Sequence, residues 1–274
     1  DSGKPDLTVG YTKFLTSILP QINPDITHEA EQKLPKGDHL TAFLGYELAK
    51  HATNTTKPTE QDPETTQATY ASRQLSLGVR LAELASYDQA LIHTKKAVAI
   101  YWHLAKVNPN FYVFSLISAM NYFAVRLADV NQHKDSLTIA KASVRVCRLA
   151  VRHNPVKHNA LLAKSLTNLA SRYAENNRTE KAVQYATEAL NLYRSIVDTP
   201  SSPYISDLAM CLNDTANHLT RANQPHKALS LSLEACDIFS RLANREPSRF
   251  KPKLAQTQMN IAIQLTKIGQ HDEA

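Results

Sequence analysis

Residues 71–102, ASRQLSLGVRLAELASYDQALIHTKKAVAIYW, set a pattern that the rest of the chain repeats. Steps of 46 residues from Leu91 reach Leu137, Val183 and Leu229, and a small residue comes just before each of them. Prolines in the connecting segments follow the same interval, at Pro63, Pro109, Pro155 and Pro247. A constant interval of this length is typical of proteins built from repeated structural units.

Each 46-residue repeat is predicted to hold two helices. In the first helix of the quoted stretch, Leu77, Leu81 and Leu84 recur at the spacing of one helix face. Asn and Gly gather at the turn that follows, and the second helix ends near a proline, which cannot continue a helix. Small residues such as Gly78 and Ala97 hold fixed places in the two helices, so two backbones can approach closely. The sequence therefore predicts an all-α stack of helical hairpins.

The repeat resembles the tetratricopeptide repeat, whose signature has Leu-Gly in the middle of helix A and Ala at two sites of helix B. Leu77-Gly78, Ala90 and Ala97 match that signature. The third repeat matches it with Leu169, Ala170, Ala182 and Ala189. A repeat of 46 residues exceeds the common length of 34 by 12, and arrays similar to it occur in fungal and actinobacterial multidomain proteins. The resemblance implies a right-handed superhelical solenoid of antiparallel helix pairs.

The predicted array occupies residues 67–274 and has four repeats plus the first helix of a fifth. Residues 1–66 are predicted to form an N-terminal helical cap or degenerate repeat followed by a polar linker, with helices over 7–19, 26–34 and 38–52. The chain begins without Met and ends where another helix B is due. We therefore expect it to be a segment of a longer protein.

Composition limits the class of protein. The 274 residues are 43% hydrophobic with a net charge of +6, which is enough apolar content for a continuous core. No run of about 20 apolar residues suggests a membrane span, and the first residues lack the layout of a signal peptide. The three cysteines show no metal-ligand spacing and are interpreted as buried reduced thiols. We expect a cytoplasmic protein without metal, cofactor or membrane contact.

One candidate site follows from the resemblance, which implies that helix A of each repeat lines a concave groove. Asparagine occupies one of two neighbouring groove positions in four consecutive repeats. The candidate groove residues are Asn121, Tyr122, Asn168, Asn213, Asp214, Asn217 and Asn260. A primary amide both donates and accepts hydrogen bonds, so such a row can bind the backbone of an extended peptide. The alternative is that these asparagines decorate a solvated helix face or stabilise neighbouring repeats.

A second candidate surface is basic. Residues 91–160 hold ten Lys or Arg against two Asp, a local balance of +8. Four of them are spaced along one predicted helix face, namely Lys141, Arg145, Arg148 and Arg152. Such a stripe can dock an acidic protein segment, a phosphorylated partner or nucleic acid. No pattern of stacking aromatics accompanies it, which disfavours nucleic acid, and the stripe is also explained as a solvated helix face.

Motifs for catalysis are absent from the sequence. There is no Gly-rich phosphate loop, no His-Glu-x-x-His and no Gly-x-Ser-x-Gly elbow. Cys147, which stands between Arg145 and Arg148, is the one weak lead for a nucleophile, and its apolar helix favours core packing instead.

The predicted function is a protein-protein interaction module, a scaffold or sensor that binds a peptide or protein segment in the groove as part of a larger chain. Long-repeat arrays often accompany nucleotide-binding switch domains or effector domains, so the resemblance also allows an intramolecular partner. Two alternatives remain open at this point. One is an adaptor that binds an acidic partner or nucleic acid through the basic stripe, and the other is an unrecognised enzyme on a helical-repeat fold.

Overall fold

The computed structural model describes residues 18–34, 39–53, 58–59, 61–152 and 155–269. Within these ranges every regular element is a helix, which confirms the predicted all-α class. The helix predicted over residues 7–19 lies almost wholly outside the described residues.

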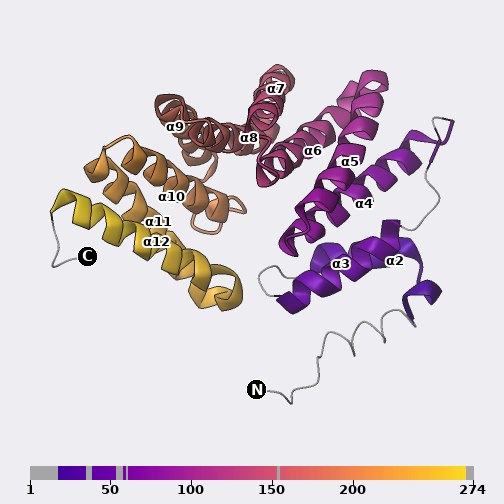
Figure 1. Ribbon diagram of the computed structural model, residues 1–274, viewed down its shortest axis with the longest axis horizontal. Coiled ribbons are helices and arrows are strands. Elements are labelled where there is room, and N and C mark those ends of the chain that lie inside the picture. The colour runs from indigo at the N-terminus through magenta and orange to yellow at the C-terminus, as the bar shows by residue number, and fades with distance from the viewer. Residues whose placement is uncertain (1–17, 35–38, 54–57, 60, 153–154, 270–274) are drawn as a thin grey trace, which may run out of the picture. The chain divides into compact units, whose positions relative to one another are not determined.

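The chain divides into two compact units, Asp1–Val130 and Asn131–Ala274, called unit 1 and unit 2 below. Unit 1 contains the short 3-10 helix η1 (Leu19–Gln21) and the helices α2 (Pro24–Lys33), α3 (His39–Thr53), α4 (Glu64–Glu83), α5 (Tyr87–Val107) and α6 (Pro109–Asp129). Unit 2 contains α7 (His133–Val151), α8 (Pro155–Glu175), α9 (Thr179–Ile196), α10 (Ile205–Arg221), α11 (Pro225–Arg245) and α12 (Pro247–Ile268). Inside each unit, consecutive helices pack against one another as hairpins (Figure 1).

These helices follow the predicted repeats closely. The helices α4, α6, α8, α10 and α12 are the A helices of the five predicted repeats, and α5, α7, α9 and α11 are B helices. The helix α4 begins at Glu64, inside the stretch predicted to be a polar linker. Pro63 directly precedes the helix, and the negative charge of Glu64 is stabilised by the positive end of the helix dipole. The polar residues there therefore belong to the start of a helix.

The turn from helix A to helix B has the same backbone conformation in every repeat. One residue of each turn has a positive φ, and these residues are 46 apart: Ala85, Asn131, Asn177, Asn223 and Gly269. Asparagine and glycine tolerate this left-handed conformation, whereas alanine adopts it at a cost in free energy. The Asn and Gly that mark the turns in the sequence therefore serve this conformation.

Small residues let the two helices of a hairpin approach closely, as predicted. Ala90 and Ala97 are fully buried on α5. At Gly78 of α4, an added Cβ would lie 2.8 Å from the Cγ2 atom of Thr94 on α5. Two repeats later, two buried alanines, Ala170 and Ala186, take the places of this Gly and Thr. The side chain on helix A is larger there and the side chain on helix B is smaller, so the two helices can keep the same spacing.

The helix α6 is the most apolar element that the structure describes. By length and composition alone it could cross a membrane, with a mean hydropathy of 1.3 over a window of 18 residues. In this structure it lies in the hairpin stack, where α5 packs against it. Leu116, Ile117, Ala124 and Leu127 are buried there. Its apolar residues thus contribute to the core of unit 1.

Candidate functional site

The first candidate surface is called the A-helix face and consists of Asn168 on α8, Asn213, Asp214 and Asn217 on α10, and Asn260 on α12. All five residues belong to unit 2. Asn260 is 8% exposed, and the other four are half-buried. Asn121 and Tyr122, the two other residues of the predicted groove, lie on α6 of unit 1, where Asn121 is 5% exposed.

Part of the asparagine row joins neighbouring repeats. The Nδ2 atom of Asn260 donates a hydrogen bond of 3.0 Å to Oδ1 of Asn213, one repeat earlier. Gln256 in turn donates to Oδ1 of Asn260 at 3.3 Å. The first bond links α12 to α10, which is the structural role that the sequence left open as an alternative, and the second lies within α12. Two half-buried amides of the row lie outside this pair: Asn217, and Asn168, which interacts with another residue of the chain.

Asp214 of the A-helix face and Asp207, earlier on the same helix, are carboxylates that are costly to charge. Desolvation raises the pKa of Asp214 to about 6, with the positive charge of Lys253 acting in the opposite direction. Desolvation also raises the pKa of Asp207 at the start of α10, against Lys164 and Arg249. A carboxylate held in this way gains stability from any cationic group brought next to it. Perturbed carboxylates of this kind are typical of functional sites.

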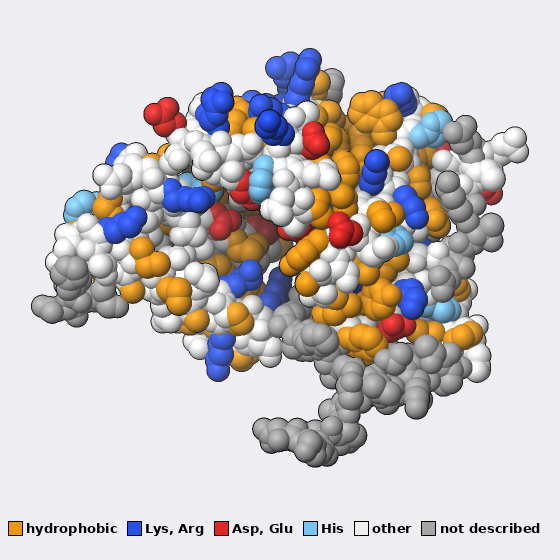
Figure 2. Space-filling model, viewed as in Figure 1, with side chains coloured by type: hydrophobic (Ala, Val, Ile, Leu, Met, Phe, Trp, Pro, Cys, Tyr) orange, Lys and Arg blue, Asp and Glu red, His pale blue; other side chains and the backbone are white. Residues whose placement is uncertain are grey.

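The second candidate surface is a groove of about 400 Å³ in unit 2, called the basic groove. It is lined by Lys141, Val144, Arg145, Arg148 and Leu149 of α7, by Arg152 at the C-cap of α7, by Leu169 and Tyr173 of α8, and by Tyr185 of α9. All four basic residues singled out in the sequence therefore line one groove. Figure 2 shows Lys and Arg side chains gathered at the upper edge of the view, over α7 and α9 as Figure 1 places them.

Two aromatic rings accompany the basic residues. Tyr173 and Tyr185 stack with their ring centroids 5.3 Å apart. The ammonium groups of Lys141 and Lys181 each lie 5.5 Å from the centroid of the Tyr173 ring. The prediction that no stacking aromatics accompany the stripe was wrong, because the tyrosines come from the next repeat. The packing of α8 and α9 against α7 brings these tyrosines to the groove, and the sequence of α7 alone does not predict it.

Some of the cations of the groove are already paired. Arg148 forms an ion pair with Glu188 of α9, with Nη2 at 2.7 Å and 2.8 Å from the two carboxylate oxygens. Arg194 and Glu234 make the same contact one repeat later, at 2.5 Å. Arg148 therefore also holds α7 to α9. Arg145 and Arg152 are exposed and form no ion pair with the side chains that the structure describes.

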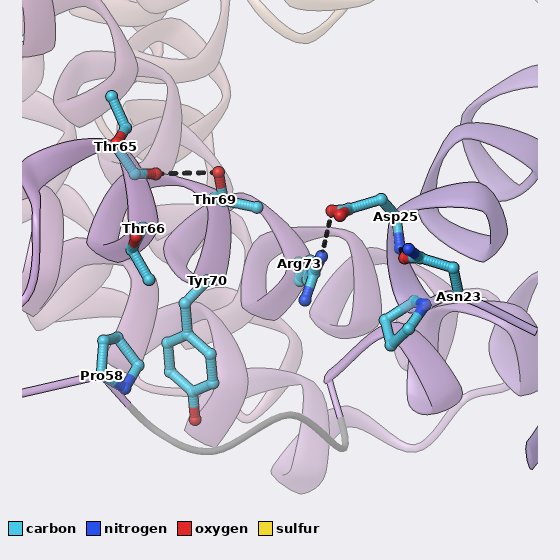
Figure 3. A pocket seen from close by; sticks show the side chains of 9 residues that line it. Asn23, Asp25, Pro58, Thr65, Thr66, Thr69, Tyr70 and Arg73 are labelled. Atoms are coloured by element: carbon cyan, nitrogen blue, oxygen red, sulfur yellow. Dashed lines mark hydrogen bonds and ion pairs between the residues drawn. The ribbon is translucent and has the colours of Figure 1, made fainter.

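A third hollow, of about 430 Å³, lies in unit 1 between the start of α2 and α4 (Figure 3). Thr65, Thr69 and Tyr70 line it from α4. The guanidinium of Arg73, which is 7% exposed, forms an ion pair with Asp25 across it. The charge in this hollow is thus balanced within the protein. It offers neither a cation nor an anion in excess.

Burial makes Cys147 and Cys211 poor nucleophiles, and Cys236, interpreted from the sequence as buried, is half-buried with a pKa raised by desolvation. Cys147 is fully buried, and burial raises the pKa of its thiol to about 11. Cys211 is buried in the same way, with a pKa of about 11. A thiol needs a lowered pKa to attack as a thiolate at neutral pH. Among the described residues, no three His, Cys, Asp or Glu side chains lie close enough together to hold a metal ion.

Helical hairpins that recur every 46 residues, with small residues between the helices and left-handed turns, define an α-helical repeat protein. Residues 162–204, which cover most of α8 and all of α9, match the family model of the tetratricopeptide repeat. The match is confined to one repeat, and the other repeats share its helical-hairpin organisation.

Solved structures share this fold at low sequence identity. BtubC (BKLC) from P. vanneervenii is 16% identical, with a TM-score of 0.61 and coverage of 86% of this chain and 84% of that one. The Rap conjugation gene regulator of plasmid pLS20, solved in complex with the Phr* peptide, is 14% identical with a TM-score of 0.58, covering 97% and 71%.

A third similar structure is the signal transduction ATPase PH0952 from Pyrococcus horikoshii, which has a tetratricopeptide repeat sensor. It is 15% identical with a TM-score of 0.57, and the match covers 95% of this chain and 35% of that protein. A comparison with curated protein sequences finds no significant match. At these identities the similar structures show the fold of the chain.

Proposed function

We propose that this protein is a protein-interaction module, a scaffold or sensor, that binds an extended segment of a partner protein across the A-helix face of unit 2. The observation that carries the proposal is the recurrence of half-buried polar side chains at equivalent places on consecutive A helices, with Asn168 on α8 equivalent to Asp214 on α10 and with Asn213 beside Asp214. The Rap regulator, solved with a peptide, and the Pyrococcus protein, with a repeat sensor, support a role of this kind.

The chemistry of the face defines the ligand. The amides of Asn168 and Asn217 can donate to and accept from a peptide backbone without selecting its side chains. Asp214, whose carboxylate is destabilised by desolvation, favours a Lys or Arg of the ligand next to it. The pair of Asn213 and Asn260 holds α10 against α12 and so fixes the spacing of the face. The expected ligand is an extended segment with one basic residue.

Three further parts of the proposal concern the setting of the module. The chain has no catalysis of its own, which the raised pKa of the Cys147 thiol supports. It works in the cytoplasm, where free thiols such as Cys147, Cys211 and Cys236 stay reduced. It belongs to a larger chain, which the match to 35% of the Pyrococcus protein supports, and a switch or effector domain of that larger chain is a second candidate partner.

The test is a binding measurement with matched variants. A partner is first identified by affinity capture and mass spectrometry, and its binding segment is then titrated by calorimetry. Asn168→Ala combined with Asn217→Ala removes two amides from the A-helix face. Asn191→Ala combined with Asn244→Ala removes two exposed amides from the B helices α9 and α11 and serves as the control.

The proposal expects affinity to fall roughly tenfold for the first pair, since two hydrogen bonds of about 0.5 to 1.5 kcal/mol each are lost. The control pair should bind like the wild type. Unchanged affinity for the first pair, with an intact fold by circular dichroism, would move the interface away from the A-helix face.

A further inference from the structure

We infer that the basic groove is a second binding site, for an acidic protein segment that places one large apolar side chain between two carboxylates. The site lies on the B helix α7 and on the hairpin of α8 and α9. It shares no residue with the A-helix face, so it goes beyond the function proposed above.

Residues of α7 and its C-cap present two cations with an apolar side chain between them. Arg145, Leu149 and Arg152 are four and three residues apart, which places them on one face of the helix. The two guanidinium groups start seven residues apart, a rise of about 10 Å at 1.5 Å per residue. Leu149 lies between them and is 53% exposed, unusual for so large an apolar side chain. The row thus presents cation, apolar side chain and cation in order.

The floor of the groove is formed by side chains that are almost fully buried. Val144, Leu169 and Tyr173 line it, and each is at least nine-tenths buried. A groove of about 400 Å³ has room for a large apolar side chain and part of its backbone. Burying such a side chain against this floor and Leu149 is favourable because apolar surface is removed from water. The floor therefore selects an apolar side chain in the middle of the ligand.

The lining of the groove is positively charged. Four of the nine lining residues are cations, and none is an acid. Glu188 neutralises Arg148, and Lys141 lies over the ring of Tyr173. Arg145 and Arg152 remain available to carboxylates, which a planar guanidinium binds through two parallel hydrogen bonds. The partner should therefore carry two acidic residues about 10 Å apart.

Charge and stacking also separate a protein ligand from nucleic acid. A phosphate backbone needs positive charge along its path, yet the places equivalent to Arg145 in the next two repeats hold Asn191 and Asp237. The place equivalent to Arg152 in the next repeat holds Asp198. Tyr173 is already covered by Tyr185 and two lysines and is not free to stack on a base. The positive charge is confined to one groove, which fits a short acidic segment.

The experiment uses two fluorescein-labelled peptides of about 12 residues, titrated by anisotropy at low and physiological salt. One peptide carries Glu, Leu and Glu at helical spacing of four and three residues, and the other carries Glu-x-Leu-x-Glu for an extended chain. A peptide with Ala in place of the Leu and a single-stranded oligonucleotide are the comparison probes. The chain is tested as wild type, as Arg145→Glu combined with Arg152→Glu, and as Leu149→Ala.

A charge-matched control variant and a second-site control accompany these proteins. Lys227→Glu combined with Lys251→Glu makes the same change of net charge at exposed sites on α11 and α12, outside the groove. Asn168→Ala combined with Asn217→Ala alters the A-helix face alone. Circular dichroism confirms that every variant is folded before binding is compared.

The inference expects at least one Glu-containing peptide to bind wild type and to lose at least tenfold in affinity with the Arg145 and Arg152 reversals. Leu149→Ala and the Ala peptide should each weaken binding severalfold, and both control variants should bind like wild type. Equal losses for the groove and the charge-matched variants would overturn the inference in favour of general attraction. It would also be overturned by tighter binding of the oligonucleotide, or by binding of neither peptide to wild type. Loss with the Asn168 and Asn217 variant alone would assign the peptide to the A-helix face instead.

Discussion

The two units of this protein differ in the ion pairs that join one helix to another. In unit 1 the guanidinium of Arg80 is 1% exposed, and its Nε donates to Glu31 of α2 at 2.6 Å. In unit 2 the inter-repeat pairs, Arg148 with Glu188 and Arg194 with Glu234, are exposed on neighbouring B helices. Breaking a buried pair leaves a buried charge and is costly, whereas an exposed pair contributes little. The buried pair of Arg80 and Glu31 therefore holds helices of unit 1 together, whereas the exposed pairs of unit 2 contribute little to its fold.

One position of the repeat shows how the charge in the interior of helix A changes along the chain. The place of Arg80 recurs every 46 residues, as Arg126, Arg172, His218 and Gln264. Each of the three arginines pairs with an acid three residues later, for example Arg172 with Glu175 at 2.7 Å. In the fourth repeat the residue three after His218 is Arg221 and not an acid. Burial and the charge of Arg221 keep the imidazole of His218 neutral. The repeat thus keeps its backbone while the charge in its interior is lost.

The largest effect on this comparison is expected from Glu31→Ala in unit 1. The change leaves Arg80 buried with only Glu83, 3.0 Å from its Nη1, as an acidic partner. We expect the free energy of unfolding to fall by about 3 kcal/mol, measured by urea denaturation. Glu188→Ala in unit 2 is the matched change and should cost less than about 1 kcal/mol. Similar small losses for both would remove the distinction between the units.

The next effect is a pH dependence that belongs to unit 2. Burial and the charge of Arg221 lower the pKa of His218 to about 4, against 6.5 in the unfolded chain. Between these values the unfolded state binds more protons, so stability is complete above pH 6.5 and is lost as the pH falls. We expect His218 to cost about 2 kcal/mol between pH 7 and pH 5.

The variant His218→Gln, with the residue that the next repeat has at Gln264, isolates this contribution. The raised pKa of Asp214 acts in the opposite direction, because its contribution to the free energy of unfolding is lost as the pH rises through about 6. The measurement is therefore the difference between variant and wild type in urea denaturation at each pH. A difference that does not change between pH 7 and pH 5 would contradict the account.

A smaller effect tests the amide pair of unit 2. Asn260→Ala removes the hydrogen bond to Asn213, and we expect a loss of about 1 kcal/mol in unfolding free energy. A double-mutant cycle with Asn213→Ala should give a coupling of similar size, because the two changes remove one shared bond. A coupling near zero would mean that the pair does not stabilise the stack, and both amides would then be available to a ligand.

The smallest effect concerns the turn of the first repeat. Ala85 has a φ of 57°, whereas the equivalent residues Asn131, Asn177 and Asn223 are of a type that tolerates this conformation. We expect Ala85→Gly to raise the melting temperature by a few degrees, corresponding to about 0.5 to 1 kcal/mol. Asn177→Ala in unit 2 should lower stability by a similar amount. Loss of stability in Ala85→Gly would show that the turn is not strained.

The sequence predicts those features that local physics determines. The interval of Leu91 and its successors gave the hairpins, and the Asn and Gly of the turns match the positive φ of Asn177 and Gly269. Contacts between repeats were harder to predict, because residues such as Asn260 and Asn213 are 47 apart and either could face solvent. The stack of Tyr173 on Tyr185 beside α7 required the packing of three helices. The division of the chain after Val130 also has no composition signal.

The most direct test of the proposed function is site-specific crosslinking of the captured partner. A photoreactive amino acid is placed at Asn217 on the A-helix face or at the exposed Asn191 on α9, and crosslinked peptides are identified by mass spectrometry. The account predicts that one extended segment of the partner crosslinks to position 217 and not to position 191. Crosslinks from position 191 alone would contradict it and place the partner on the B helices.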